Sequence, residues 1–504
     1  MALADYFHRS AVALAQVLSG FDEDAIRSKL EEKTVGIAFS SDSVTKPEGR
    51  ATVELAVRLL ARLYPRLVLV GGDIDFLEHA RSLARLINPS IDISDGDADI
   101  LVAVGSTEMT APLMIFVGSN GWDAHVSTAG PKELGETNNP FGAGAAACFG
   151  AANVFRAVFH GEHAQFDEEL TLSTLDMTTD ATSDNVAIDD VDLGPSNVLI
   201  GVGAIGNAAV WALGRSPLKG TVHLVDNQTL ELSNMQRYVL PVRDNENRAK
   251  VELAAAAFHG GLVPIAHPLD WATFAATEGY QWQRVIVALD SARHRRAVQA
   301  SLPRWIANAW TQPGDLGVST HSWTEGACLS CLYLPAGELP NEDKLIATAL
   351  GIARPERELQ IRNLLHAGAS PPREMLEEIA GKLEVPLDAL LPFEERPLRE
   401  LYVVGICGGV VLPLSRIGTP TQDVHIPIAH QSALAGVLLA GRLVAHAIQR
   451  VPTGAQVSRI NVLEPLPQLM GSLTQPIAKD PRGLCICQDR VYADAYALKY
   501  STEN

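Results

Sequence analysis

The residues of this chain that could do chemistry begin with a glycine loop. An apolar run from Asn197 leads into GVGAIG, which contains Gly201, Gly203 and Gly206, and a helix-forming run follows. Glycines at a strand-to-helix turn let backbone N–H groups and the helix dipole face a phosphate. By itself this loop fits dinucleotide-dependent dehydrogenases and mononucleotide-binding enzymes equally, and a tight structural turn would use the same glycines.

Side chains downstream of the loop separate these chemistries. A second apolar strand ends at Asp226, SNMQR supplies Asn234 and Arg237, RAK supplies Lys250, and Asp290 follows a third apolar strand. Hydride transfer has little use for an Arg and a Lys directed at the same phosphates. Attack of a carboxylate on the α-phosphate of ATP, in contrast, needs cations and Mg²⁺ there. As a set these residues predict adenylation, although each alone could be a solvated surface charge.

The order GVGAIG, LVD, SNMQR, RAK and ALDS resembles the adenylation domain of the ThiF, MoeB and ubiquitin-activating-enzyme superfamily. The resemblance covers residues 195–335 and resumes after residue 400. Members of this superfamily adenylate the C-terminal glycine of a ubiquitin-like protein. The resemblance implies that ATP is bound by Gly201, Gly203, Gly206, Asp226, Asn234, Arg237 and Lys250, and that Asp290 is the Mg²⁺ ligand.

Four cysteines form two closely spaced pairs. Cys328 and Cys331 make a C-x-x-C on an expected loop, and Cys485 and Cys487 make a C-x-C near the C-terminus. Two such pairs can enclose a tetrahedral Zn²⁺, and the resemblance implies a structural zinc of this kind. The C-x-C spacing strains simultaneous chelation, so buried thiol pairs and a redox dithiol remain as alternatives.

Cys407 lies in YVVGICGGVVLP, which resembles the segment where activating enzymes carry their thioester cysteine. The superfamily usually places residues between that cysteine and the glycines, and this chain has none. A thioester role requires a thiolate, and Arg416, His425 and His430 follow closely in the sequence. We expect Cys407 to be the acceptor; a small core residue is the alternative.

The first half of the chain reads as a degenerate copy of the second. A small-residue helix around Cys148 and a strand after residue 168 are matched by a helix from Ala433 and a strand from Val457. The copy lacks the glycine fingerprint, the SNMQR run and the lysine, so we expect it not to bind ATP. An unrelated α/β domain is the alternative. We expect Cys148 to be a core residue.

The expected fold class is α/β, with two Rossmann-like adenylation units of the ThiF type and a small helical insertion. The inactive unit would span residues 1–180 and the ATP-binding part of the active unit 181–335. The insertion would span 336–400, and 401–504 would complete the active unit with the crossover and the zinc-bearing tail. Helical periodicity (Leu345, Ala349, Ile352; Met375, Ile379, Leu383) and breaks at Pro372 and Pro386 mark the insertion. A surface excursion of no consequence is the alternative for this stretch.

Composition narrows the partners. The chain has 504 residues, 47% of them hydrophobic, and a formal charge of −19. This charge excludes nucleic acid as an expected partner and suits a basic protein, such as a ubiquitin-like protein or a conjugating enzyme. The N-terminus lacks the apolar run of a signal peptide, and no segment has the length of a charge-free membrane span. We expect a cytoplasmic location without membrane attachment, which keeps thiols reduced.

These observations predict a ubiquitin-activating-like enzyme. It would adenylate the C-terminal glycine of a ubiquitin-like protein with Mg·ATP, form a thioester at Cys407, and pass the modifier to a ubiquitin-conjugating-like enzyme. The fused halves resemble activating enzymes of bacterial operons of the Bil type, which are associated with defence against phage. A ThiF- or MoeB-like sulfur-carrier adenylyltransferase and a catalytically silent scaffold are the main alternatives, and an NAD-dependent dehydrogenase is a more distant one. A monomer, as a pseudo-dimer of two halves, and a homodimer both fit.

Overall fold

The computed structural model describes residues 3–18, 23–179, 185–313, 315–334, 342–406, 427–466 and 472–501. The chain divides into two compact units. The larger unit comprises Met1–Tyr6, Lys29–Leu334 and Ile428–Asn504, and it contains both β-sheets. The smaller unit comprises Phe7–Ser28 and Pro335–Pro427, and helices make up its described secondary structure.

The first sheet of the larger unit has seven strands in the order β3-β2-β1-β4-β5-β6-β7. They are β1 (Val35–Phe39), β2 (Arg66–Gly71), β3 (Asp92–Ser94), β4 (Ile100–Val104), β5 (Leu113–Asn120), β6 (Asp123–Ser127) and β7 (Glu169–Ser173). Strands from β3 to β5 pair in parallel, whereas β6 and β7 pair antiparallel. Strands β1 and β4 are buried along their whole length, as expected of parallel strands covered on both faces.

The second sheet has eight strands in the order β10-β9-β8-β11-β12-β13-β14-β15. They are β8 (Asn197–Ile200), β9 (Gly220–Val225), β10 (Leu262–His267), β11 (Arg284–Val287), β12 (Trp305–Gln312), β13 (Asp315–Ser322), β14 (Gln456–Ile460) and β15 (Thr474–Pro476). Its first seven strands, counted along the chain, have the same spatial order as the first sheet and the same change from parallel to antiparallel pairing. The α/β fold class is therefore confirmed, and the two sheets share one topology.

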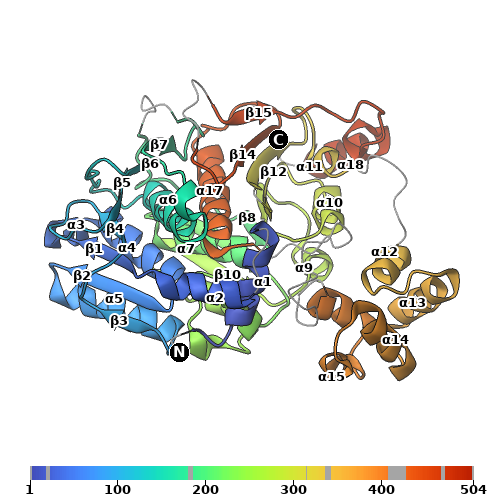
Figure 1. Cartoon of the computed structure of the whole chain (residues 1–504). Coiled ribbons are helices and arrows are strands. Elements are labelled where there is room, and N and C mark those ends of the chain that lie inside the picture. The colour runs from blue at the N-terminus through green and yellow to red at the C-terminus, as the bar shows by residue number, and fades with distance from the viewer. Residues whose placement is uncertain are drawn as a thin grey trace. The chain divides into compact units, whose positions relative to one another are not determined.

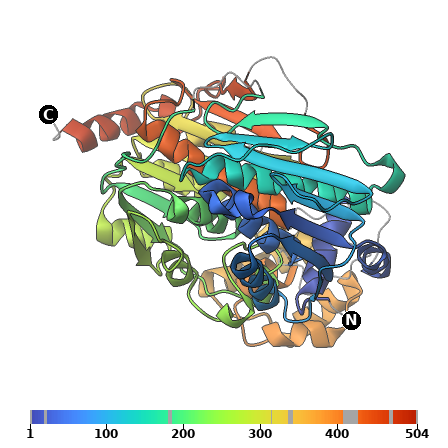
Figure 2. The same cartoon turned by 90° about the vertical axis from the view of Figure 1, so that its left-hand side faces the viewer.

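Helices α4 (Pro47–Leu60), α6 (Pro140–Phe159), α7 (Ala204–Arg215) and α17 (Ala429–Ala447) connect the two halves of the larger unit (Figures 1 and 2). Helix α6 packs against α4 and α17, and α17 packs against α7 and the second sheet. Small residues allow this close packing: a Cβ atom on Gly436 would lie only 2.2 Å from the carbonyl oxygen of Ile205.

Helix α6 is the one described helix that is long and apolar enough to cross a membrane, by length and composition only. Of the 18-residue stretch that meets this criterion, 94% is buried inside the protein, as expected of a core helix. Cys148 lies on α6 with 1% of its surface exposed, and burial raises the pKa of its thiol. The expectation that Cys148 is a core residue is confirmed.

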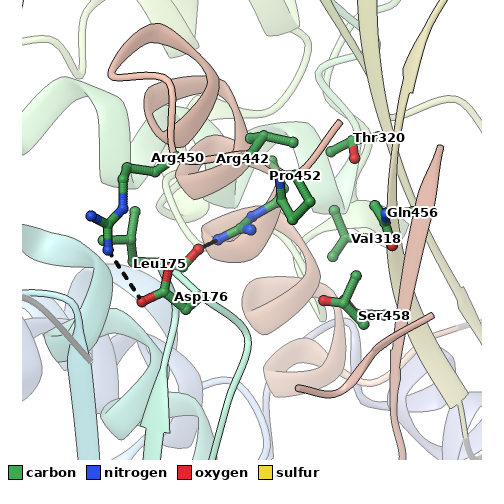
Figure 3. Close-up of a pocket in the computed structure, with 11 residues that line it drawn as sticks. Leu175, Asp176, Val318, Thr320, Arg442, Arg450, Pro452, Gln456 and Ser458 are labelled. Carbon is green, nitrogen blue, oxygen red and sulfur yellow. Dashed lines mark hydrogen bonds and ion pairs between the residues drawn. The ribbon is translucent and has the colours of Figure 1, made fainter. Parts of the chain in front are cut away.

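Two buried arginines link the halves reciprocally. Arg156, on α6 of the first half, donates from Nη1 to the carbonyl oxygens of Val462 at 2.9 Å and Glu464 at 2.8 Å, just beyond β14. Arg442, on α17 of the second half, donates to the carbonyl oxygens of Thr174 and Leu175, just beyond β7. Figure 3 shows Arg442 beside Leu175. Each crossover helix therefore binds the backbone that follows the seventh strand of the opposite half.

The larger unit contains seven further described α-helices. They are α3 (Ser41–Thr45), α5 (Ile74–Ile87), α8 (Lys250–Ala255), α9 (Trp271–Glu278), α10 (Ala292–Ala300), α11 (Leu329–Leu332) and α18 (Arg490–Tyr500).

The smaller unit contains α1 (Phe7–Val17), α12 (Glu342–Ala349), α13 (Pro355–Ala367), α14 (Arg373–Leu383), α15 (Leu387–Leu390), α16 (Leu398–Glu400) and a π-helical turn, Leu401–Ile406; helix α2 (Glu23–Glu32) spans the boundary between the units. Pro372 and Pro386 directly precede α14 and α15, so both prolines mark helix starts. The expected periodicity is wrong in one place: Ile346 is in the core, whereas Leu345 is 44% exposed.

We predict that Asp167→Ala destabilises the larger unit by about 3–5 kcal/mol, because it leaves the Arg156 guanidinium buried without its carboxylate partner. The side chains of Arg156 and Asp167 are 1% and 0% exposed. Urea denaturation measures the loss. The matched control is Asp190→Ala, which removes an exposed ion pair with Lys219 and should leave the unfolding midpoint unchanged. Equal effects of the two substitutions would contradict this account of the interface.

Candidate functional site

The glycine loop leaves the carboxyl end of β8, a central strand of the second sheet. Ile200 pairs with Val225 of β9 on one side and with Val287 of β11 on the other. The segments that follow these three parallel strands therefore begin at the same edge of the sheet. Ligands of open α/β sheets bind at this edge.

Two of the three glycines are required by the fold itself. Gly201 has a φ of +86°, and a Cβ atom there would lie 2.7 Å from the carbonyl oxygen of Ala288. A Cβ atom on Gly206 would lie 2.0 Å from the carbonyl oxygen of Gly201. At Gly203 the nearest atom to such a Cβ is the Tyr238 hydroxyl at 3.6 Å, so packing does not demand glycine there. Close approach of a ligand to the backbone would explain it.

Asp226 braces the loop. Its Oδ2 accepts a hydrogen bond from the Val202 N–H at 2.8 Å, and its Oδ1 accepts one from the Gln228 N–H at 2.9 Å. The carboxylate keeps further acceptor capacity for a ribose. The structure thus brings Asp226 to the glycine loop, as the sequence predicts.

Arg237 and Lys250 gather around one aromatic ring. The guanidinium carbon of Arg237 lies 5.6 Å and Lys250 Nζ 5.3 Å from the centre of the Tyr238 ring. Lys250 is 5% exposed and donates to Gln228 Oε1 at 2.7 Å, while Arg237 Nη1 donates to the Ser233 carbonyl at 3.3 Å. Within the described part of the chain neither cation forms an ion pair with a carboxylate.

The electrostatics of these two cations favour an anion. Burial lowers the pKa of Arg237. Burial also acts to lower the pKa of Lys250, but nearby Tyr238 and Asp226 outweigh it and the pKa is raised. Arg237 acts to lower the pKa of Lys250, as expected of two like charges that share one ring, and their direct hydrogen-bond partners are neutral, so an anion bound between them would be stabilised by both.

Of the two remaining predicted ATP-site residues, Asn234 is buried within a turn and Asp290 is exposed at a strand end. Asn234 is 7% exposed, and its Oδ1 accepts from the Glu231 N–H at 3.1 Å, which fixes the turn carrying SNMQR. Asp290 is exposed just beyond β11. The buried Arg295 donates from Nε to the Leu289 carbonyl at 2.9 Å and so holds the backbone next to Asp290.

Sequence reasoning missed three side chains of this region: Gln228, Tyr238 and Arg295. Gln228 and Arg295 stand in no recognisable motif, so no signal pointed to them. Tyr238 directly follows the SNMQR run. An aromatic residue beside a predicted phosphate-binding arginine was the available signal.

A second candidate site, separate from the glycine loop, is formed by the sulfur atoms of four cysteines. The Sγ atoms of Cys328, Cys331, Cys485 and Cys487 all lie within 4.8 Å of one another. Cys328 is 3.4 Å from Cys485, and Cys331 is 3.5 Å from Cys487. Sulfurs about 2.3 Å from a tetrahedral zinc would be about 3.8 Å apart, so this cluster could hold the ion.

Local structure explains how the short C-x-C pair takes part. A 3₁₀ turn, Ile486–Gln488, lets Cys485 and Cys487 each face a different cysteine of the first pair. The expectation of a loop at the C-x-x-C is wrong, because Cys328 precedes the short helix α11 and Cys331 lies within it. A helical turn brings both sulfurs to one side.

Cys407, Arg416 and His425 lie outside the described residues. His430 is described and stands at the start of α17, 4% exposed. Burial, together with Arg156, lowers its pKa to about 3. Its imidazole is therefore neutral at physiological pH and supplies no positive charge.

A cavity of about 40 Å³ lies away from the glycine loop. Asp176, Thr320, Arg442 and Arg450 are among its lining residues, and none of the predicted nucleotide-binding residues lines it (Figure 3). Asp176 and Arg450 approach to 3.8 Å beside it. The cavity belongs to the contact made by Arg442 between the halves.

Two family models match different parts of the chain. Residues 193–462 match the ThiF family, and residues 38–160 match Prokaryotic E2 family C. The chain belongs to the ThiF family, whose members are adenylyltransferases that bind ATP. The two matches together are consistent with an enzyme of a bacterial ubiquitin-like conjugation system.

Two individual proteins extend the comparison. An uncharacterized protein, y4jF, of Sinorhizobium fredii (strain NBRC 101917 / NGR234) is 43% identical over 514 residues, which cover 99% of this chain and 98% of the relative. The crystal structure of SeMet PaaA aligns with 25% of this chain and 41% of that chain, at 20% identity and a TM-score of 0.22.

The match to Prokaryotic E2 family C does not bring an acceptor thiol with it. Cys148 is the one cysteine within residues 38–160. An acceptor must be an accessible thiolate, whereas Cys148 is buried and the pKa of its thiol is raised. In this structure Cys148 therefore lacks both properties of an acceptor thiol.

We predict that the purified chain contains one zinc ion and that Cys331→Ser or Cys487→Ser removes it, because three thiolates bind the ion more weakly than four. Zinc released by a thiol-modifying reagent and counted with a colorimetric chelator gives the stoichiometry. Cys148→Ala is the control and should retain the metal. A zinc-free wild-type chain that is fully folded would refute the metal site and leave buried thiols or a redox dithiol.

Proposed function

We propose that this chain is a ubiquitin-activating-like enzyme. It adenylates the C-terminal glycine of a ubiquitin-like protein with Mg·ATP in its second half. The acyl group then passes to Cys407 as a thioester and from there to a ubiquitin-conjugating-like enzyme. The observation that carries the adenylation step is the pair Arg237 and Lys250, two cations without carboxylate partners among the described residues.

The chemistry follows from these groups. A carboxylate oxygen of the modifier attacks the α-phosphorus of ATP, and the bond from that phosphorus to the bridging oxygen breaks. Pyrophosphate leaves with the electron pair. Arg237 and Lys250 stabilise the negative charge on the phosphate oxygens, while Asp226 orients the ribose. Asp290 would hold Mg²⁺, which when bound offsets further phosphate charge.

The second step uses the cysteine thiolate. The sulfur of Cys407 attacks the carbonyl carbon of the acyl-adenylate, a C–S bond forms, and AMP leaves with the electrons of the broken C–O bond. The proton of the thiol must leave before attack. A sulfur-carrier adenylyltransferase would share the first step without this one.

We further propose that the first half is an adenylation unit without an ATP site. After β1 the chain enters α3 directly, where Ser40 Oγ accepts from the Ser43 N–H at 3.1 Å and Ser43 Oγ donates to the Val104 carbonyl at 2.9 Å. After β2, Asp73 accepts from the Phe76 N–H and caps α5. Local side chains thus occupy the positions where the second half presents its glycine loop and ribose carboxylate.

The partners follow from charge and context. A formal charge of −19 favours a basic modifier or conjugating enzyme. The two family matches support a place in bacterial ubiquitin-like conjugation, and we propose phage defence as the setting. The four cysteines would hold structural zinc.

We predict ATP:pyrophosphate exchange that depends on a ubiquitin-like protein encoded beside this gene. Lys250→Met should lower the exchange rate by about 100-fold or more, because a preorganised cation at the phosphates is lost. The control Lys219→Met changes a lysine whose side chain is 61% exposed and should leave exchange intact. Absence of exchange with every neighbouring modifier would favour the scaffold instead.

We predict that the modifier forms a bond to the wild-type chain that dithiothreitol cleaves, and that Cys407→Ala abolishes this bond while pyrophosphate exchange persists. Non-reducing gels after incubation with Mg·ATP show the adduct. Cys148→Ala, a buried cysteine, is the control and should still form it. Exchange without any thiol-sensitive adduct in the wild type would identify a sulfur-carrier type of enzyme.

A further inference from the structure

The segment Tyr238–Pro241 is a stretch of irregular backbone, buried except at the half-buried Leu240, that links the SNMQR turn to the next helical turn. Irregular backbone has no ladder to satisfy its polar groups, and buried carbonyls without donors are costly. The amide of Leu240 donates to Asn207 Oδ1 at 2.7 Å, on α7 of the second half. The four carbonyl oxygens of the segment need donors from elsewhere.

Those donors come from the first half of the chain. Just after α4, Arg62 donates from Nε to the Tyr238 carbonyl at 2.7 Å and from Nη2 to those of Val239 at 3.3 Å and Pro241 at 2.6 Å. Arg58 of α4 donates from Nη1 to the carbonyls of Val239 and Leu240, both at 2.9 Å. All four carbonyls are satisfied by two arginines.

Both arginines are held in place. Arg62 is 2% exposed, and burial lowers its pKa to about 9, so it stays charged at neutral pH. Arg58 pairs with Glu54 at 2.9 Å, and Glu54 also pairs with Arg215 at the end of α7. Burial acts to raise the pKa of Glu54, but Arg215 and Arg58 outweigh it and hold the value at about 2. The network therefore stays ionised.

The segment in turn carries the ring around which the site cations gather. Tyr238 packs in a small core with Tyr6, Leu230 and Met235. Its hydroxyl is the nearest atom to the open side of Gly203, and Lys250 and Arg237 lie over its ring. A displacement of the Tyr238 backbone would therefore move the support of both cations and one wall of the glycine loop together.

We propose that Arg62, assisted by Arg58, is a positioning residue for the nucleotide site. By satisfying the carbonyls of residues 238–241 it fixes Tyr238 beneath Lys250, so the first half contributes to ATP affinity without touching the nucleotide. Arg62 suits this role because its planar fork reaches three carbonyls at once, which a lysine ammonium cannot do. The inference rests on the proposed function only in taking Mg·ATP as the ligand.

The test measures the affinity of the full chain for the non-hydrolysable analogue AMPPNP with Mg²⁺. Arg62→Met should weaken binding by about 10- to 100-fold, because the cations lose their alignment. The matched control is Arg442→Met. It removes another buried arginine that crosses between the halves to donate to backbone carbonyls, but at the contact beyond β7. The control should bind the analogue within about two-fold of wild type, since it does not touch the Tyr238 segment.

Thermal melting of both variants separates positioning from general loss of stability. Similar melting temperatures with unequal affinities support the proposal. If Arg62→Met does not fold, Arg62→Lys keeps the charge but replaces the planar fork by a single ammonium nitrogen, which cannot take the positions of both Nε and Nη2, and it should still weaken binding. Tyr238→Leu should reproduce the affinity loss, and the double substitution with Arg62→Met should add little, because both act through one segment.

Three outcomes distinguish the hypotheses. Unchanged affinity in both Arg62 variants, with a wild type that binds the analogue, overturns the positioning role and leaves adenylation standing. Weakened affinity in the variants, together with a wild type that shows no modifier-dependent exchange, supports the positioning role and removes the adenylation step. A wild type that does not bind the analogue overturns both.

Discussion

Guanidinium groups that satisfy buried backbone carbonyls hold the two halves of the larger unit together. Arg62, Arg156 and Arg442 are each at most 5% exposed, and each donates across the boundary between the halves to carbonyls that no strand or helix satisfies. The carbonyls bound by Arg156 and Arg442 lie just beyond the ends of β14 and β7, where the strand ladder no longer supplies donors. Arginine suits these places because one side chain can satisfy two or three acceptors in fixed directions.

The same use of neutral partners gives the candidate site its electrostatic character. Lys250 donates to a side-chain amide and Arg237 to a carbonyl. Such partners fix the direction of a cation without forming a direct ion pair with it, although the carboxylate of Asp226 is near enough to Lys250 to raise its pKa. An ion pair with a carboxylate would orient the cation equally well, but an incoming phosphate would then have to displace a charged competitor. Neutral hydrogen-bond partners therefore leave the site ready to bind an anion. Keeping two cations close together without an ion pair costs free energy, and the hydrogen-bonded backbone around them holds them in place despite this cost.

The sequence was sufficient to predict those features that a short stretch of residues determines. The glycine loop, Asp226, and the repeated order of elements each leave a signal within a short stretch, because strand ends and tight turns require particular residues. Prediction from the sequence failed for contacts and buried faces that depend on packing between residues far apart in the chain. Arg62 lies 176 residues from Tyr238, so no local pattern connects them. The buried face of α12 differs by one residue from the expected one, since Leu345 and Ile346 are equally apolar and only the neighbouring helices choose between them.

Two features explain why a half without a glycine loop would keep this topology. One is the self-capped start of α3 after β1, and the other is the pair Arg58 and Arg62 at the end of α4. Ser40 and Ser43 satisfy the start of α3 internally, which stabilises that half without a ligand. The following helix α4 still presents Arg58, and Arg62 just beyond its end, to the segment beside the second half's cations. Loss of Arg58 and Arg62 would leave the carbonyls of residues 238–241 without these donors at the edge of the site. The strand order of the first half is thus constrained by what its helices do for the other half, whether or not it ever binds a nucleotide itself.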